Sequence, residues 1–284
     1  MERTPVTFVE DVLRIVLAIG ELSKYKKLSG KFELCAETLE RNNHDTHLCV
    51  KGGVFEKIHD CCKYGFVGDK TNLLPKYRIR KLVQFHALGP KFDPCPIDLK
   101  DKLQIFLKES GMLALHLHRL WLNDEWINIF SSWKNLNSIE IDDLLSDPVL
   151  LLLENVLRQG SLLQLKVNDM YGYDDELDLF CRFLEQKQFL NLFFYRDEPM
   201  IDRIQTETNL ERFTGSTITW DFDSTLHNDS FECLGLVDDD TIQYKKENLV
   251  VTYFHASYFY DNVPKARTLQ EFANRVWRSE MRFL

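Results

Sequence analysis

The sequence predicts an α/β protein whose parallel sheet is built from repeated strand–helix units. Two observations predict this fold class: a short apolar motif recurs at a nearly constant spacing, and the segments between its copies carry helix signals. Three copies of the motif align without gaps, each with the pattern apolar-x-x-apolar-x-apolar. They begin at Leu136, Leu162 and Phe189, which places them 26 and 27 residues apart.

This spacing falls within the ~20–29 residues typical of leucine-rich repeats. A further copy begins at Leu117, and a weaker one places Ile218 and Trp220 at the positions that Leu192 and Phe194 hold in the third. One such unit is too small to bury its own apolar face, so neighbouring units must stack. We therefore expect a leucine-rich-repeat-like curved solenoid over residues 76–225. A doubly wound α/β domain, which uses the same alternation, is the alternative.

The segments between the motif copies contain signals for helix starts and ends. Asp147 can cap the start of a helix, Pro148 suits its first turn, and Gly160 suits a left-handed C-terminal cap. The acidic residues 174–176 favour the N-terminus of the next helix, because its dipole is positive there. Shorter helices are expected to begin near Asp98 and Asp124.

The regions on either side of the repeats differ from them. Residues 1–65 are predicted to be helical, with Val6, Val9 and Leu13 on one apolar stripe and a loop or hairpin over residues 42–53. Residues 78–85 are expected to form the first strand of the repeat region. In the last segment, 226–284, residues 248–255 predict a buried strand, and 269–281 predict a terminal helix that caps the open end of the stack.

The composition limits which binding partners and which cellular compartment we expect. Acidic residues outnumber basic ones, 44 to 35, for a net charge of −9, which disfavours nucleic acid and anionic membranes as partners. Apolar runs fall far short of the ~20 residues that a bilayer span requires. The N-terminus lacks the pattern of a signal peptide, and the seven cysteines show no framework spacing. We expect an intracellular protein, cytoplasmic or nuclear.

One segment resembles the first motif of haloacid dehalogenase-type phosphatases. It carries Asp221, Asp223 and Thr225 after a hydrophobic stretch. The resemblance implies Asp221 as nucleophile, Asp223 as acid/base and a bound Mg²⁺ ion. Only about sixty residues follow, too few for the domain that such a sheet needs, and Ile218 and Trp220 already fit the repeat. We therefore predict that the chain is not an enzyme and has no catalytic residue, with the phosphatase as a distant alternative.

Histidines and cysteines gather between residues 44 and 62. Their spacing matches no familiar zinc motif, which usually contains tight Cys-x₂₋₄-Cys or His-x₃₋₅-His pairs. We interpret them as surface histidines and buried free cysteines, and we predict no metal and no cofactor. The residues are His44, His47, Cys49, His59, Cys61 and Cys62.

Side chains that alternate with the motif's apolar residues are expected to share the concave face of the sheet. The aromatic side chains among them would be exposed and are of the types enriched at binding hot spots. The alternative is that helices or the C-terminal segment cover these aromatics and make them a second core. The expected binding residues are Arg119, Trp121, Glu140, Lys166, Phe193 and Tyr195.

Taken together, the chain resembles the nematode-expanded family of F-box-like proteins with leucine-rich-repeat-like C-terminal regions. The similarity rests on residues 4–16, on the repeats over 117–194 and on the strand around 250–254 with the helix expected after it. It implies a small helical F-box-like N-terminal region that docks on a Skp-type adaptor through Val6, Val9 and Leu13. The repeats would then hold an unknown protein target for a ubiquitin ligase. An interaction module without any ubiquitin-ligase link is the alternative.

Overall fold

The computed structural model describes most of the chain. The described residues are 5–19, 30–62, 65–66, 77–86, 95–118, 121–169, 171–195, 198–221, 232–238, 240–260, 263–266, 271–272 and 275–284. The chain is an α/β protein with a largely parallel sheet, as predicted, and it divides into two compact units, Met1–Ile139 and Glu140–Leu284. The boundary lies inside strand β6 (Leu136–Leu144), within the predicted repeat region.

Unit 1 (Met1–Ile139) has the strand order β3-β2-β1-β4-β5. Strands β1, β4 and β5 run parallel to one another, whereas β2 and β3 continue the sheet in antiparallel fashion. Its elements are α1 (Val6–Ile19), α2 (Lys31–Asn42), β1 (His44–Lys51), β2 (Val54–Cys62), β3 (Gly65–Phe66), β4 (Arg78–His86), α3 (Ile97–Lys108), β5 (Met112–His118) and α4 (Asp124–Ser131).

One face of the unit 1 sheet is buried beneath α4. The Phe85 ring of β4 meets Trp126 and Phe130 edge to face, with ring centroids 5.2 and 5.0 Å apart. Because side chains alternate along a strand, Gln84 and His86 lie on the opposite face. Helix α4 itself begins where the Asn123 side chain accepts a hydrogen bond from the Trp126 amide.

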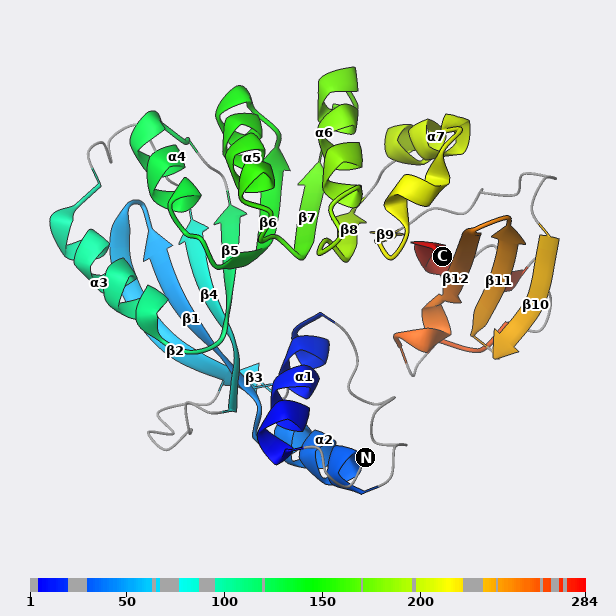
Figure 1. Cartoon of the computed structure of the whole chain (residues 1–284), viewed down its shortest axis with the longest axis horizontal. Helices are drawn as coiled ribbons and strands as arrows, with labels where there is room; N and C mark the ends of the chain where they lie inside the picture. The colour runs from blue at the N-terminus through cyan, green and yellow to red at the C-terminus, as the bar shows by residue number, and fades with distance from the viewer. Residues whose placement is uncertain are drawn as a thin grey trace. The chain divides into compact units, whose positions relative to one another are not determined.

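Unit 2 (Glu140–Leu284) contains the rest of β6 and the strand order β7-β8-β9-β13-β12-β11-β10. Helices α5 and α6 lie along one side of β7 and β8 (Figure 1). The elements are α5 (Asp147–Gln159), β7 (Gln164–Asp169), α6 (Asp174–Leu184), β8 (Asn191–Phe194), α7 (Glu198–Thr206), η3 (Leu210–Phe213), β9 (Thr217–Asp221), β10 (Glu232–Asp238), β11 (Thr241–Lys246), β12 (Leu249–His255), η4 (Ala256–Tyr258) and β13 (Val276–Phe283).

The predicted repeat motif falls on adjacent parallel strands in unit 2. Leu165, Leu192 and Ile218 are paired across β7, β8 and β9, and all three are fully buried. Before β7, helix α5 carries Pro148 in its first turn and is capped by Gly160, whose φ of 64° is the left-handed conformation that favours glycine. The motif spacing, the parallel pairing of these strands and the cap at Gly160 are therefore confirmed. The N-terminal cap of α5 is Ser146, one residue before the predicted Asp147.

The copy predicted to begin at Leu117 is wrong. Strand β5 ends at His118, and the residues that it buries on the helix side are Leu113, Leu115 and Leu117. Leu113 lies 26 residues before Ile139, so the spacing of the repeat does extend to this strand, with the motif several residues earlier than predicted. The dense run of leucines around 113–122 makes more than one alignment fit, and the pairing of β5 with β4 decides among them.

The N-terminal segment is helical over a shorter range than predicted. Helix α2 ends at Asn42, and strands β1 and β2 form an antiparallel hairpin. A loop or hairpin was predicted over residues 42–53, but the second strand continues to Cys62, where the N-terminal region was predicted to be helical. Strand β1 also pairs with β4 in parallel, so the strand at residues 78–86 is not the first of the parallel group. Alternating buried and half-buried residues in β1 carry the strand signal.

The terminal helix predicted over 269–281 is wrong. Residues Val276–Phe283 form strand β13, which pairs antiparallel with β9 on one side and with β12 on the other. Ser279, Met281 and Phe283 are buried, and charged residues alternate with them. This period of two is the pattern of a half-buried strand.

Among the described residues, none of the helices has the length and apolar character needed to span a bilayer.

Helices α1 and α2 pack against each other and against the start of β4. Val9 and Leu13 are fully buried with Ala36, Leu39 and Ile79. Two of the three residues predicted to dock on an adaptor, Val9 and Leu13, therefore stabilise unit 1 internally, and Val6 remains on the surface, 47% exposed.

This packing predicts a large difference between two alanine substitutions on the same helix. Leu13→Ala removes a fully buried side chain and should lower the free energy of unfolding by about 2–5 kcal/mol. Val6→Ala changes an exposed side chain and should alter it by less than about 0.5 kcal/mol. Urea unfolding followed by circular dichroism measures both. Equal effects would contradict the packing of α1 on α2 and β4.

Candidate functional site

The strand face opposite the helices in unit 2 carries a band of polar side chains. Phe194 of β8 contacts Phe180 of α6, with ring centroids 5.2 Å apart, so its neighbour Phe193 lies on the other face. The pairing of β7, β8 and β9 places Lys166, Phe193 and Thr219 side by side there. Strand β13 continues the band with Arg278 and Glu280.

Phe193 lies between two cations. The Lys166 Nζ atom is 5.2 Å from the centre of its ring, and the Arg278 guanidinium carbon is 5.3 Å from it. Both distances fall within the ~6 Å over which a cation is attracted to an aromatic face. Each cation is in turn held by a carboxylate: Lys166 bonds Glu140, and Arg278 bonds Asp221. We call these five residues the Phe193 cluster.

The two ion pairs of the Phe193 cluster differ in burial. Arg278 donates two hydrogen bonds to Asp221, from Nε to Oδ1 at 2.7 Å and from a terminal nitrogen to Oδ2 at 3.3 Å. The cations are similarly exposed, Arg278 at 34% and Lys166 at 36%, but the Asp221 side chain is only 10% exposed and that of Glu140 is 32% exposed. Exposed ion pairs contribute little to folding stability, so the Arg278–Asp221 pair contributes more than the Lys166–Glu140 pair.

The structure brings together three of the six predicted binding residues: Glu140, Lys166 and Phe193. Tyr195 lies just beyond the end of β8 and is 42% exposed. Trp121 is 63% exposed but follows β5 instead of lying on it, and Arg119 is outside the described residues.

Sequence reasoning missed Arg278 because the segment around it was predicted to be helical. The signal was present in the alternation of Arg278, Glu280 and Arg282 with buried residues. Asp221 was singled out for a different chemistry, as a phosphatase nucleophile. Both of its carboxylate oxygens accept hydrogen bonds from Arg278, and the other two residues of that motif, Asp223 and Thr225, lie outside the described part of the chain.

The corresponding face of unit 1 is rich in histidine. The registers of β1, β2, β4 and β5 place five of the eight histidines of the chain on this face. The rings of His86, His116 and His118 lie close together, with centroids 5.6 to 6.4 Å apart. The five are His47, His59, His86, His116 and His118.

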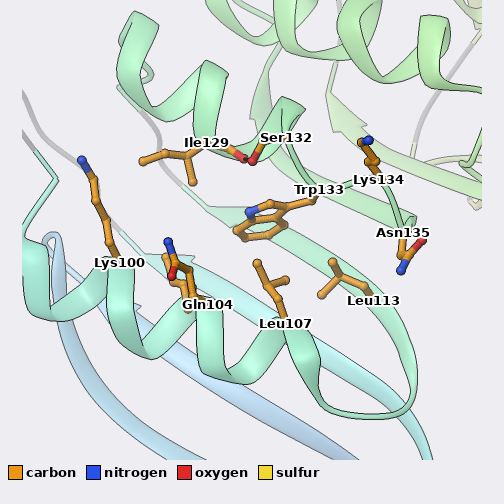
Figure 2. A pocket seen from close by; sticks show the side chains of 10 residues that line it. Lys100, Gln104, Leu107, Leu113, Ile129, Ser132, Trp133, Lys134 and Asn135 are labelled. Carbon is orange, nitrogen blue, oxygen red and sulfur yellow. Dashed lines mark hydrogen bonds between the residues drawn. The ribbon is translucent and has the colours of Figure 1, made fainter.

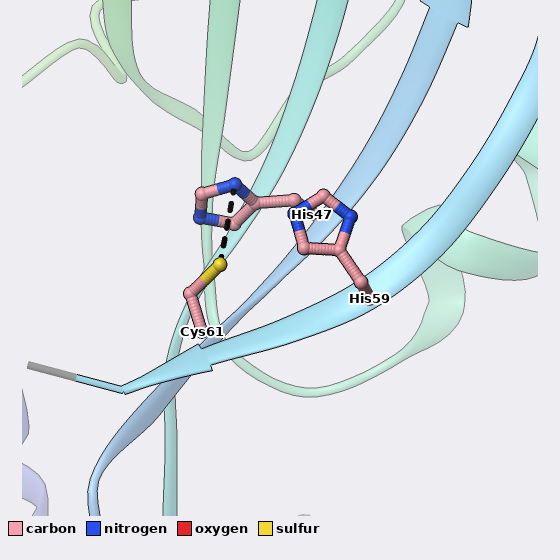
Figure 3. Close-up of side chains that lie close together, drawn as sticks. All are labelled: His47, His59 and Cys61. Carbon is pink, nitrogen blue, oxygen red and sulfur yellow. Dashed lines mark hydrogen bonds between the residues drawn. The ribbon is translucent and has the colours of Figure 1, made fainter. Parts of the chain in front are cut away.

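At one end of this face, His47, His59 and Cys61 come together on the β1–β2 hairpin (Figure 3). Each offers one potential metal-ligand atom, and these atoms all lie within 4.8 Å of one another. The Cys61 Sγ atom is 3.9 Å from His47 Nδ1. Cys49 lies nearby, with its Sγ 3.9 Å from His59 Nδ1 and 3.4 Å from the Gln84 Oε1 that accepts its hydrogen bond.

Burial sets the protonation of these side chains. Partial removal from water lowers the pKa of both His47 and His59 below the ordinary value of 6.5, because it disfavours the charged imidazolium. The nearby Asp45 acts in the opposite direction on the pKa of His47. Burial also raises the pKa of the Cys49 thiol. Near neutral pH the two imidazoles are therefore uncharged, the form in which histidine binds a metal.

A pocket of about 330 Å³ lies on the helix side of unit 1 (Figure 2). Leu103, Leu107 and Trp133 supply much of its apolar lining, and Lys100 lies at its margin. The volume is at the low end of the ~300–1,000 Å³ typical of ligand pockets. Lys100 is bonded to Glu125, so its charge is already balanced without a ligand.

Comparison with known proteins adds no assignment. No family model, no curated protein and no solved structure matches the chain. The case for function therefore rests on the geometry of the two strand faces.

The Phe193 cluster predicts a contrast between its two cations. Arg278→Met leaves the largely buried Asp221 carboxylate without its two charged hydrogen bonds, and should lower the free energy of unfolding by about 1.5–3 kcal/mol. Lys166→Met removes an exposed pair and should cost less than about 1 kcal/mol. Chemical unfolding of both variants tests this; a larger loss from Lys166→Met would contradict the difference in burial.

Proposed function

We propose that the chain is a protein-recognition module that binds its target on the polar strand face of unit 2, at the Phe193 cluster. The observation that carries this proposal is the position of the half-buried Phe193 ring between Lys166 and Arg278. Aromatic and arginine side chains at the centre of a surface are the types that dominate binding energy at protein interfaces.

Two properties of the cluster support recognition of a protein in particular. Its two cations are already held by Glu140 and Asp221, so binding would cost little side-chain entropy. Its charges are also balanced, two positive and two negative. This balance favours a partner with a mixed polar and apolar surface over a polyanionic partner. The wider face adds hydrogen-bonding groups beside the ring, such as Asn191, which accepts a bond of 3.1 Å from Thr219.

In the narrower form of the proposal, the chain is the substrate-recognition subunit of a ubiquitin ligase. The F-box-like resemblance suggests it, with the strand–helix units forming a leucine-rich-repeat-like solenoid. The α1–α2 pair would contact a Skp-type adaptor through residues other than the buried Val9 and Leu13. Three exposed apolar side chains are available on this pair: Val6 at 47%, Phe8 at 57% and Leu34 at 64% exposure.

The proposed target face can be tested with a matched pair of substitutions in unit 2. Phe193→Ala should weaken binding of a captured protein partner about 30-fold, the equivalent of a ~2 kcal/mol hot spot. Leu151→Ala, at a 47% exposed position on α5, should leave binding unchanged. Quantitative affinity capture from cell extract, followed by titration of the partners recovered, measures both.

Lys166→Ala provides an independent check, because it changes the same face at little cost in stability. It should also reduce partner binding. Partners whose affinity is insensitive to Phe193 and Lys166 but sensitive to Leu151 would place the interaction on the helix side and reject the proposed face.

The adaptor contact predicts a separate result. Phe8→Asp should abolish a complex between the purified chain and a Skp-type adaptor, whereas Thr7→Ala, on the same exposed turn, should preserve it. Size-exclusion chromatography of the mixture is sufficient. If the unmodified chain forms no complex, the ubiquitin-ligase form of the proposal is rejected. The chain would then be an interaction module that binds its target through Phe193 and has no link to a ubiquitin ligase.

A further inference from the structure

The β1–β2 hairpin presents two His-x-Cys segments to the same face of unit 1. His47 and Cys49 alternate with Leu48 on β1, and His59 and Cys61 alternate with Asp60 on β2. The hairpin register places His47 opposite His59. Since the strands are antiparallel, the two cysteines lie diagonally on opposite sides of the histidine pair. The register therefore brings together residues that are far apart in sequence.

The distances suit a tetrahedral metal ion. Zinc binds sulfur at about 2.3 Å and nitrogen at about 2.0–2.1 Å, which separates the two ligand atoms by roughly 3.6 Å. Cys61 Sγ and His47 Nδ1 are 3.9 Å apart, and the ligand atoms of His47, His59 and Cys61 lie within 4.8 Å of one another. Side-chain rotation would close the remaining gap without movement of the strands.

We propose that His47, His59 and Cys61 bind a zinc ion, with the fourth position open to water. Nitrogen and thiolate ligands favour zinc and cobalt, whereas magnesium and calcium favour the oxygen ligands that this set lacks. All three side chains are partly exposed, so an ion can reach them from solvent. Binding would release the Cys61 thiol proton to water as the Zn–S bond forms.

Cys49 is placed outside this ligand set. Its side chain is 4% exposed, and its thiol donates to Gln84 on the neighbouring strand. Gln84 also approaches His116, with its Nε2 3.4 Å from His116 Nδ1. This network would hold the β1 side of the site in place, in the manner of the outer partners that orient metal ligands.

The ion would fasten β2 to the sheet. Strand β2 pairs along its length with β1, and on its other side, within the described part of the chain, it pairs only with the two-residue strand β3. On the opposite face, a hydrogen bond of 2.5 Å from Thr46 to Asp60 also joins the hairpin. A zinc ion bound by His47 of β1 and by His59 and Cys61 of β2 would therefore stabilise the margin of unit 1.

The test uses Co²⁺ as a probe on the full chain, reduced and stripped of metal with EDTA. A thiolate-to-cobalt charge-transfer band should appear in the near ultraviolet and saturate at one equivalent, and Zn²⁺ should displace it. Cys61→Ser should abolish the band. His59→Gln should weaken Co²⁺ binding by at least ~100-fold, because the loss of a residue that only orients a metal ligand can already cost that much. Circular dichroism of each variant verifies folding.

Two matched cysteine variants complete the test. Cys233→Ser, at an exposed position in unit 2, and Cys49→Ser should both keep the band. Absence of a thiolate band in the unmodified chain would overturn the proposal, as would a band that survives Cys61→Ser. Loss of the band in Cys49→Ser with the fold intact would overturn the assignment of three ligands. Histidine and carboxylate sites elsewhere cannot mimic these results, because they contain no thiolate.

Discussion

The in-register pairing of buried apolar residues across parallel strands is the constraint on which the rest of unit 2 depends. Leu165, Leu192 and Ile218 form one layer beneath the helices, and Val167, Phe194 and Trp220 form the next. A one-residue slip of any strand would expose its whole apolar set, which makes the register strongly specified. The same register fixes what the other face presents. Lys166, Phe193 and Thr219 meet there because their neighbours are needed in the core.

Once this face is fixed, its electrostatics follow from burial. Arg278 binds the largely buried carboxylate of Asp221 beside Phe193, and Lys166 binds the more exposed carboxylate of Glu140. The first pair acts as part of the scaffold, whereas the second is free to exchange partners at small cost. The hairpin of unit 1 shows the same logic with different side chains: alternation gathers His47, His59 and Cys61 on one face while Leu48 and Val50 are buried on the other.

Local periodicity made the fold class, the helices between repeats and the buried layers of β7 and β8 predictable from the sequence. What could not be predicted were pairings between distant segments. The association of β13 with β9 brings Arg278 to Asp221 across 57 residues of sequence, and neither residue signals the other locally. The hairpin register that unites His47 with Cys61 is likewise a tertiary property, so a search for familiar sequence spacing did not find it. Leu117 shows a third limit, since a leucine-rich run fits several alignments and only the pairing of β5 with β4 decides among them.

The shared strand face can be tested most directly by cysteine cross-linking between β7 and β8. Residues paired on adjacent strands are about 4.8 Å apart, and a disulfide requires Cα atoms within roughly 7 Å and side chains on the same face. The variant with Lys166→Cys and Phe193→Cys should form a disulfide under mild oxidation, identified by peptide mass mapping. The variant with Lys166→Cys and Phe194→Cys should not, because Phe194 points to the core. A disulfide in the second variant and none in the first would contradict the register and the recognition face built on it.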